Sequence, residues 1–327
     1  MRATSAPEQL TDVVLYGDAP AREADRLRRL LGAGFRVVPL PATVPRAACA
    51  EALAEVRIMV AYAYGRADPP APRLQLLQCM AAGTDRIELE ALPPGCAVLS
   101  ATGHEIAMAE FAIAAILDWQ IGFRALTMRT PDGTWSQQDW IKGPTHDEVF
   151  GRTVGLVGYG RVAHEIAQRA HGFGMRVAAI SRWSGSTEHA MPGLCRFPMD
   201  AYRDFLAECD FVVVTLPLEA ATRSIIDHAW FAAMRPRTVL INIGRGAVVD
   251  EAELFASLRD RRIRGATLDV WWRYPAGEQM REPMADHPVH TLPNVVASPH
   301  AAARTPQMLE RRWQGIAANI RAAASTG

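Results

Sequence analysis

The stretch GLVGYGRVAHEIAQRAHGFGMRVAAISRW, residues 155–183, has the order of a strand, a glycine turn, a helix and a second strand. Its Gly158, Gly160 and Ala163 fit the spacing G-x-G-x-x-G/A. The first glycine permits a tight turn, the second lets the backbone approach a pyrophosphate, and the small third residue lets helix and strand pack closely. The helix that follows presents N–H groups and the positive end of its dipole to an anion. The stretch therefore predicts a βαβ unit that holds a dinucleotide.

The glycine pattern alone is weak evidence, because any tight turn from a strand into a helix favours glycine. Its surroundings make it more specific, since the apolar run TVGLV precedes the turn and the helical pattern AHEIAQRAHGF follows it. The turn residues expected to contact the cofactor are Gly158, Tyr159, Gly160, Arg161 and Val162.

The second strand of this unit ends at Ser181 and Arg182, where a protein that binds NAD usually carries an acid. A carboxylate there would accept hydrogen bonds from the ribose 2′-OH and repel a 2′-phosphate. Arg182 attracts that phosphate instead, and its guanidinium can stack on adenine. Ser181, Ser184 and Ser186 add hydroxyl donors. The sequence thus favours NADP(H), with NAD(H) left open, against the alternative that Arg182 is only a solvated loop charge.

Chain length and charge balance limit which classes of protein the sequence can represent. With 327 residues the chain is longer than one compact core usually fills, so we expect two domains. Lys plus Arg and Asp plus Glu both number 35, whereas a nucleic-acid or membrane binder usually has a basic excess. The five cysteines are scattered without a CxxC pair, as is typical of a reducing cytoplasm, and no metal site is predicted.

Two further segments bear on location. The first residues lack the apolar core of a signal peptide. The apolar run 107–123 is interrupted by Glu110 and Asp118 and is too short and too charged to span a bilayer. We therefore expect a cytoplasmic protein whose partners are small molecules rather than nucleic acid or membrane.

Strand and helix patterns alternate in two separate runs. The first begins with DVVLYG at Asp12 and ends near Gly103, and a long apolar helix starts at His104. The second opens with TVGLVGYG and continues through FVVVTLP, TVLINIG, GATLDVW and NVVASPH. Such alternation is typical of a parallel sheet covered by helices on both faces, so we predict an α/β protein with two lobes.

Six motifs follow one another along nearly the whole chain: AAGTDRIEL, GRTVGLVGYGRVA, TLPLEAATRSIID, INIGRGAVVDEAEL, ATLDVW and NVVASPHAAART. In this order they resemble the D-isomer-specific 2-hydroxyacid dehydrogenase family, which includes glyoxylate/hydroxypyruvate reductases and phosphoglycerate dehydrogenase. The resemblance implies a Rossmann-type doubly wound cofactor domain, residues 104–298, inserted into a smaller flavodoxin-like substrate domain made of residues 1–103 and 299–327. It also implies a homodimer.

The resemblance assigns Arg245 as the catalytic arginine and His300 as the acid/base histidine. Hydride transfer to a 2-keto acid builds negative charge on the carbonyl oxygen, so a cation and a proton donor are needed there. A guanidinium stays charged and can bridge carboxylate and carbonyl oxygens, and an imidazole exchanges a proton near neutral pH. The alternatives are a structural ion pair of Arg245 with Asp250 or Glu251, and a structural role for His300.

The resemblance also implies contacts beyond these two groups. Ala82, Gly83 and Thr84 lie in the segment whose backbone N–H groups hold the substrate carboxylate in the family, although an ordinary turn would also explain them. Arg161 is expected near the pyrophosphate and Asp269 near the nicotinamide amide. The other positions implied to contact the cofactor are Thr215, Pro217, Ile243 and His300.

One position departs from the family pattern. Most members carry a glutamate five residues after the aspartate of the DV motif, and this chain has Tyr274 there. A neutral phenol cannot stabilise an imidazolium as a carboxylate does. Three interpretations stay open: Tyr274 orients His300, another acid replaces the glutamate, or the redox chemistry is different or absent. The candidate acids are Glu278, Glu282 and Asp286.

Together these features predict an oxidoreductase that transfers a hydride between NADP(H) and a small 2-keto or D-2-hydroxy acid, such as glyoxylate or hydroxypyruvate. One alternative is a related dehydrogenase of a non-standard substrate such as formate or phosphite. The other is a regulator that binds the cofactor but has lost turnover, for which Tyr274 is the support.

Overall fold

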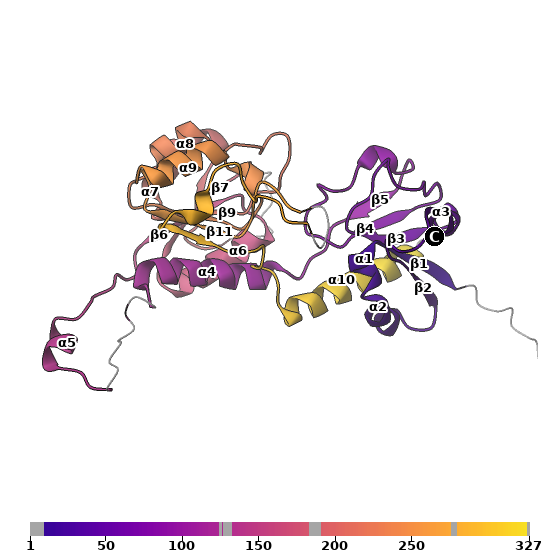
Figure 1. Cartoon of the computed structure of the whole chain (residues 1–327), viewed down its shortest axis with the longest axis horizontal. Coiled ribbons are helices and arrows are strands. Elements are labelled where there is room, and N and C mark those ends of the chain that lie inside the picture. Colours follow the sequence, from indigo (N-terminus) through magenta and orange to yellow (C-terminus); the bar gives the residue numbers. More distant parts are fainter. Residues whose placement is uncertain (1–9, 124–125, 127–132, 183–190, 276–279, 326–327) are drawn as a thin grey trace, which may run out of the picture. The chain divides into compact units, whose positions relative to one another are not determined.

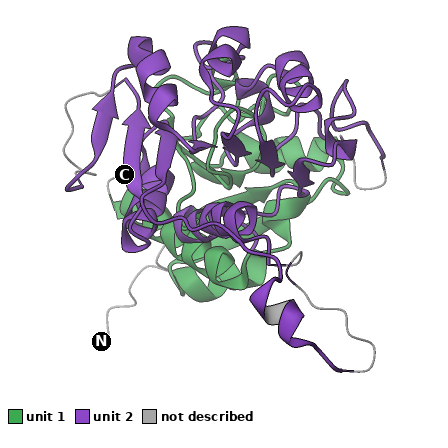
Figure 2. Cartoon of the chain, turned by 90° about the vertical axis from the view of Figure 1, so that its left-hand side faces the viewer, with its two compact units in different colours: residues 1–104, 305–327 green, residues 105–304 purple. Residues whose placement is uncertain are grey.

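The computed structural model describes residues 10–123, 126, 133–182, 191–275 and 280–325. The chain divides into unit 1, residues 1–104 and 305–327, and unit 2, residues 105–304 (Figure 2). The chain returns to unit 1 at residue 305, six residues beyond the expected boundary at 299, and His300 falls in unit 2. The functions assigned to the two domains stay predictions.

Among the described residues, unit 1 holds a five-stranded parallel sheet in the order β2-β1-β3-β4-β5 (Figure 1). This is the flavodoxin-like strand order, in agreement with the flavodoxin-like domain that the family resemblance implied. The strands are β1 Thr11–Tyr16, β2 Phe35–Leu40, β3 Ile58–Ala61, β4 Leu76–Cys79 and β5 Ala97–Leu99. The helices are α1 Asp18–Ala21, α2 Ala24–Leu31, α3 Arg46–Ala54, the short η1 Leu89–Ala91 and α10 Pro306–Ser325.

Both ends of the chain build the core of unit 1. On one face of the sheet, α10 buries Trp313 and Ile316 beside Leu27 of α2 and Val13 of β1. On the other face, Leu53 of α3 packs in a cluster with residues of β3 and β4. Because each face is covered, the central strands are apolar runs rather than alternating ones.

Among the described residues, unit 2 holds a seven-stranded parallel sheet in the order β12-β11-β10-β9-β6-β7-β8. Counted from β6, its first strand, this is the Rossmann order with one strand added, so the predicted fold class is confirmed. The strands are β6 Thr153–Val157, β7 Arg176–Ile180, β8 Cys195–Phe197, β9 Phe211–Val214, β10 Val239–Asn242, β11 Gly265–Leu268 and β12 Val295–Ala297. The α-helices are α4 Glu105–Ile121, α5 Gln137–Ile141, α6 Arg161–Gly172, α7 Tyr202–Glu208, α8 His228–Ala233 and α9 Glu251–Arg259. Short helical turns are η2 Met199–Ala201, η3 Gly246–Val248 and η4 Val289–Thr291.

Helices cover both faces of this sheet. In Figure 1, α7, α8 and α9 lie on one side of the strands, and α4 and α6 lie on the other. Close packing requires glycine at Gly155, where a Cβ would stand 2.2 Å from Cys209 Sγ and 2.7 Å from the Phe205 ring. No helix in the described part of the chain is long and apolar enough to cross a membrane.

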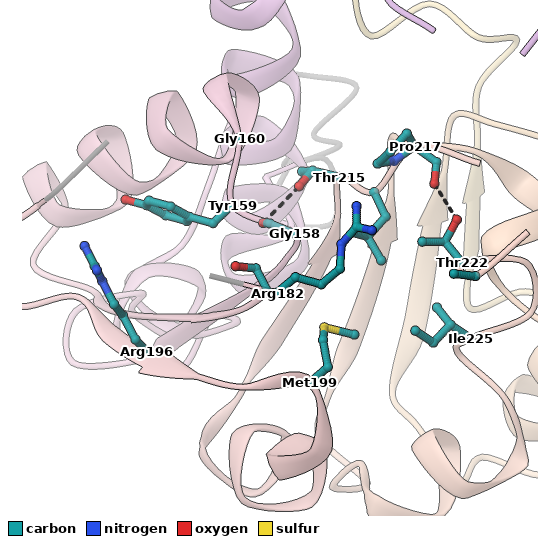
Figure 3. A pocket seen from close by; sticks show the side chains of 13 residues that line it. Gly158, Tyr159, Gly160, Arg182, Arg196, Met199, Thr215, Pro217, Thr222 and Ile225 are labelled. Carbon is teal, nitrogen blue, oxygen red and sulfur yellow. Dashed lines mark hydrogen bonds between the residues drawn. The ribbon is translucent and has the colours of Figure 1, made fainter. Parts of the chain in front are cut away.

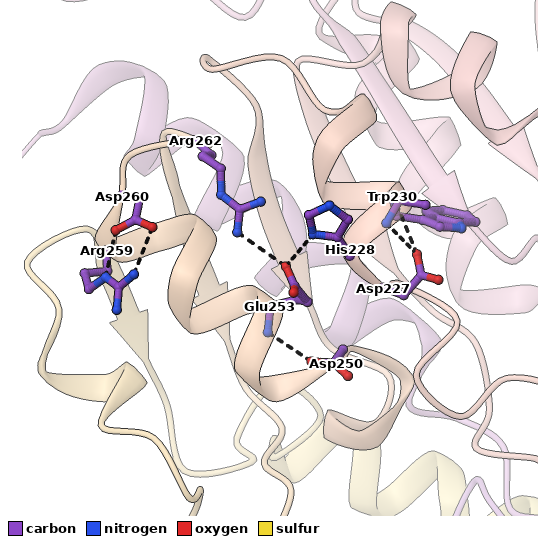
Figure 4. A network of polar contacts seen from close by, with 9 residues as sticks. Asp227, His228, Trp230, Asp250, Glu253, Arg259, Asp260 and Arg262 are labelled. Atoms are coloured by element: carbon purple, nitrogen blue, oxygen red, sulfur yellow. Dashed lines mark hydrogen bonds and ion pairs between the residues drawn. The ribbon is translucent and has the colours of Figure 1, made fainter.

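Polar contacts at the starts of α8 and α9 fix the helices of one face (Figure 4). Asp227 caps α8 by accepting hydrogen bonds from the backbone N–H groups of Ala229 and Trp230, at 2.9 and 3.2 Å. Asp250 caps α9 through the N–H of Glu253 at 2.9 Å. The hydrogen bond from His228 lowers the pKa of the Glu253 carboxyl below its usual value. Each cap satisfies helix N–H groups that lack a partner within the helix.

Candidate active site

The predicted functional residues of unit 2 follow the ends of its parallel strands. Gly158 follows β6, Arg182 follows β7, Arg245 follows β10, Asp269 follows β11 and His300 follows β12. Because the strands are parallel, all these positions lie at the carboxyl edge of one sheet, where ligands bind in open α/β folds. The fold thus brings together motifs that are far apart in sequence.

A cavity of about 670 Å³ opens where the strand order reverses between β6 and β9 (Figure 3). The predicted residues that line it are Gly158, Tyr159, Gly160, Ser181, Arg182, Thr215 and Pro217. The other predicted cofactor residues, Arg161, Val162, Ile243, Asp269 and His300, are not among its lining residues. The sequence analysis missed Arg196, Met199, Leu216, Ala221, Thr222 and Ile225.

Arg196 is the missed residue with the clearest chemistry, because it brings a second cation to the cavity. It lies on β8, and its Cα pairs with that of Ala179 on β7. A prediction of a third strand after the glycine turn would have placed Arg196 at the edge of the sheet. That strand, β8, is only three residues long, and the sequence analysis did not predict it.

The glycine turn has the geometry that a pyrophosphate needs. Gly158 has φ 87°, and a Cβ there would lie 2.9 Å from a Leu216 methyl group, so this position requires glycine. At Gly160, by contrast, nothing lies within 4 Å of a Cβ, and the missing side chain leaves space in front of the backbone. Thr215 Oγ1 donates toward Val157 O at 3.1 Å and Gly158 O at 3.2 Å, which joins the ends of β6 and β9. The open space, the N-terminus of α6 and the adjacent cations fit a dinucleotide.

Arg182 extends along the cavity with its side chain 75% exposed. Its Nη2 lies 3.5 Å from Glu219 Oε2, on the loop that follows β9. The structure therefore pairs the proposed phosphate-binding cation with a carboxylate. Ser184 and Ser186, also expected as donors, lie outside the described residues.

Side-chain and backbone hydrogen bonds fix the loop that carries Arg245. The buried Asn242 accepts from Gly244 N at 3.1 Å and donates to Arg245 O at 3.1 Å. Arg245 Nη1 donates to Gly244 O at 2.9 Å. A Cβ on Gly246 would lie 2.3 Å from the backbone of Trp271, so this loop packs directly on the segment that follows β11. These bonds order the turn, and the guanidinium folds back onto it through the Gly244 carbonyl oxygen.

Asp250 and Glu251, the acids that would make Arg245 purely structural, have other partners. Asp250 caps α9 through Glu253 N. Glu251 Oε1 accepts from His287 N at 2.6 Å and lies 3.2 Å from His287 Nδ1. Both acids therefore have a described partner, and the catalytic role of Arg245 stays a prediction.

Asp269 is 1% exposed, and its carboxylate organises the segment after β12. It accepts from Ser298 Oγ at 2.6 Å, from Ala301 N at 2.6 Å and from Ala302 N at 2.9 Å. Residues on both sides of His300 are thereby tied to one buried group. Its expected place near the nicotinamide amide stays a prediction, and the described contacts give it a positioning role.

His300 and Tyr274 form a hydrogen-bonded pair. Tyr274 Oη lies 2.8 Å from His300 Nδ1, and the two rings meet at 61° with centroids 5.5 Å apart. Trp271 N donates to Tyr274 Oη at 3.2 Å. Because this N–H approaches the phenol oxygen, the phenol proton is available for His300 Nδ1, and a neutral imidazole then carries its own proton on Nε2.

The phenol can also accept from the ring. If the imidazole is charged, Nδ1–H donates to the second lone pair of Tyr274 Oη. Tyr274 thus matches either charge state of His300, whereas a glutamate would favour the charged one. His300 itself has φ 55°, a left-handed conformation that costs a residue with a Cβ about 1–2 kcal/mol. Strain of this kind is held in place by the surrounding contacts.

The acids proposed as substitutes for the glutamate have different surroundings. Asp286 forms an ion pair with Arg273, and Glu282 is exposed. Glu278 lies outside the described residues. Since Tyr274 occupies Nδ1 of His300, these contacts favour the interpretation in which Tyr274 orients the histidine.

The predicted substrate loop lies in unit 1 and follows β4 at the carboxyl edge of that sheet. Ala82 and Thr84 are exposed and Gly83 is half-buried. Ile87 N donates to Thr84 O at 2.9 Å, and Cys79 Sγ contacts Gly83 O at 3.4 Å. The loop is thus an ordered turn, and its binding of a carboxylate stays a prediction.

Among the described residues, no group of three or more His, Cys, Asp or Glu side chains is arranged to hold a metal ion. The Rossmann sheet, the glycine turn and the cavity at the carboxyl edge instead define a dinucleotide-binding protein. Comparison with known proteins gives the family. The model of the D-isomer specific 2-hydroxyacid dehydrogenase NAD-binding domain matches residues 113–302, and the chain belongs to this family.

Relatives and a solved structure agree with that assignment. The chain is 34% identical over 242 residues to a glyoxylate/hydroxypyruvate reductase B of Pectobacterium carotovorum, covering 72% of this chain and 71% of that protein. It is 31% identical over 255 residues to a D-3-phosphoglycerate dehydrogenase of Mycobacterium bovis, covering 77% of this chain and only 46% of that protein. A D-isomer specific 2-hydroxyacid dehydrogenase from Xanthobacter autotrophicus Py2, solved with NADPH and MES, superposes with TM-score 0.73 at 25% identity over 97% of this chain and 96% of that one. The family predicted from the sequence is confirmed.

Proposed function

We propose that this protein is an NADP(H)-preferring reductase of a small 2-keto acid, and that its product is the D-2-hydroxy acid. The observation that carries the proposal is the hydrogen-bonded pair of His300 and Tyr274 at the sheet edge that also carries the glycine turn and the rigid Arg245 loop. The name of the Pectobacterium relative makes glyoxylate and hydroxypyruvate the first substrates to examine.

In this proposal the cofactor binds along Gly158–Ala163, with its pyrophosphate at the N-terminus of α6. When bound, the nicotinamide supplies the hydride. Arg182 contributes a cation at the cavity for the 2′-phosphate. The NADPH in the Xanthobacter structure supports this choice by analogy.

The protein's own groups hold the substrate and move the proton. Arg245, on its fixed turn, binds the substrate carboxylate and polarises the carbonyl. His300 gives the proton to the developing alkoxide from Nε2, because Nδ1 is bonded to Tyr274. The charged ring donates Nδ1–H to Tyr274 Oη, and it keeps this bond after Nε2 has given up its proton, so the ring keeps its orientation. Backbone N–H groups of Ala82–Thr84, in unit 1, are proposed to bind the substrate carboxylate, as the family resemblance implies.

The decisive experiment follows the loss of NADPH or NADH absorbance with a panel of 2-keto acids. We expect turnover with glyoxylate or hydroxypyruvate, a higher kcat/KM with NADPH, and loss of turnover in His300→Ala. A higher kcat/KM with NADH contradicts the cofactor preference. Tight NADPH binding without turnover on any substrate, formate and phosphite included, supports the regulator instead.

The homodimer and the cytoplasmic location belong to the same proposal. Light scattering on the purified chain tests the first, with twice the mass of 35.8 kDa as the expected result. A monomer that turns over normally would show that assembly is not required for the reaction.

A further inference from the structure

We propose that Glu219 is a specificity-determining residue, whose carboxylate competes with the 2′-phosphate of NADP(H) for the Arg182 guanidinium. Glu219 would thereby limit the preference for the phosphorylated cofactor. The inference rests on the proposed function, in which Arg182 binds that phosphate.

Geometry places Arg182 at the cavity and the Glu219 carboxylate next to Arg182. Arg182 follows β7 and lines the cavity, and Glu219 lies on the loop after β9. Their side chains meet at 3.5 Å between Nη2 and Oε2. Figure 3 shows the Arg182 side chain turned toward the side of the cavity that carries Pro217 and Thr222, which flank Glu219 in sequence.

The loop holds Glu219 in place without using its side chain. Thr222 Oγ1 donates to Pro217 O at 2.7 Å and accepts from Glu219 N at 2.8 Å. Thr222 N donates to Glu219 O at 3.1 Å. Because these bonds involve backbone atoms of Glu219, a substitution of its side chain leaves the turn intact. The carboxylate is therefore a negative charge anchored near Arg182.

The pair is weak enough to be displaced. Its side chains are 75% and 46% exposed, and exposed ion pairs contribute little because water screens them. A 2′-phosphate brings more charge and more acceptor oxygens than a carboxylate, so it can replace Glu219 on Arg182. The displaced carboxylate then lies beside a second anion and repels it. NADH has only a hydroxyl at this place and meets no such repulsion.

The experiment measures dissociation constants for NADPH and NADH by fluorescence titration of the full chain at low salt. The variants are Glu219→Gln, Arg182→Gln and the double substitution. Glu55→Gln is the matched control, since Glu55 also forms an exposed ion pair, with Arg73 in unit 1.

We expect Glu219→Gln to tighten NADPH binding about threefold to tenfold while NADH changes by less than about twofold. The gain should shrink as salt rises, because the repulsion is screened. It should also be smaller in the Arg182→Gln background, where the competition is gone. The control should bind both cofactors as the unmodified protein does.

The outcomes separate this inference from the function on which it rests. If Arg182→Gln weakens NADPH but Glu219→Gln leaves it unchanged or weaker, Glu219 supports Arg182 and the inference is wrong. If Arg182→Gln leaves NADPH binding unchanged, the phosphate site itself is wrong, and both fail. Thermal unfolding of each variant verifies that the fold is retained.

Discussion

The two halves of the unit 2 sheet carry different candidate sites at the same carboxyl edge. Around β6 and β7 the candidate cofactor site is centred on a glycine turn and a helix N-terminus within a short stretch of chain, and Arg182 and Arg196 add cations to its cavity. Around β11 and β12 the candidate catalytic site depends on side chains that bond across 26 to 33 residues of sequence. The glycine turn of the first half is formed by neighbouring residues in the sequence, whereas the second half is a network in which each member positions another.

The sharpest way to break this contrast is to remove the imidazole. In His300→Ala we expect kcat/KM to fall about 10²–10⁴-fold, the range for loss of a general acid. The Kd for NADPH should change little, because the first half of the sheet is untouched. Stopped-flow reduction and a binding titration test the two halves separately. A variant that retains a tenth of the activity would contradict the assigned role.

Asp269 tests whether the second half behaves as a network. Asp269→Ala leaves the N–H groups of half-buried Ala301 and buried Ala302 without their acceptor, which should lower the free energy of unfolding by about 2–4 kcal/mol. Displacement of His300 should reduce kcat on the order of 10²-fold. Urea unfolding and kinetics measure both. The matched surface change Asp260→Ala should affect neither, because Asp260 is exposed and forms its ion pair with the exposed neighbour Arg259.

Arg182→Asp tests the local character of the first half. Loss of a charge-assisted phosphate contact should lower kcat/KM with NADPH about 10- to 100-fold, while the value with NADH stays within about threefold. Steady-state kinetics with both cofactors measure the ratio. If both values fall together, Arg182 serves the fold or the adenine rather than the phosphate.

Substitutions of Tyr274 should change the rate least, and their effect should appear mainly in its dependence on pH. A carboxylate in Tyr274→Glu stabilises the imidazolium, so the pH above which reduction slows should rise by about one unit, since reduction needs the charged ring. Tyr274→Phe loses the bond to Nδ1 but adds no charge, and should slow reduction less than about tenfold at each pH. If Tyr274→Phe matches the unmodified protein at every pH while Glu282→Gln or Asp286→Asn is inactive, another acid serves His300.

The same contrast explains what the sequence could predict. The glycine turn, the parallel α/β character of both sheets and the presence of Arg182 follow from local patterns with a period or a spacing, whereas the two fold types were implied by the family resemblance. Gly158 has φ 87°, a conformation that favours glycine, so the residue type alone indicates the turn. Local patterns were therefore sufficient for the glycine turn and Arg182, but not for Arg196, which lies on a strand that the sequence did not predict.

For the second half, the sequence predicted which residues belong to the site but not the hydrogen bonds between them. Sequence marked Asp269 for the cofactor, but three hydrogen bonds to residues 298–302 became apparent only when β11 and β12 were paired. Likewise, the approach of Trp271 N to Tyr274 Oη depends on a turn that no motif encodes. The pairing of Glu219 with Arg182 was missed because it joins two loops of different strands.

The backbone at His300 constrains what evolution or design can place there. Histidine, asparagine and aspartate tolerate a φ of 55° better than most residues, and branched side chains tolerate it poorly. Variants at this position would therefore differ in stability as well as in catalytic activity. Comparing each variant with Asn, which keeps the backbone preference but offers no titrating ring, would separate the two.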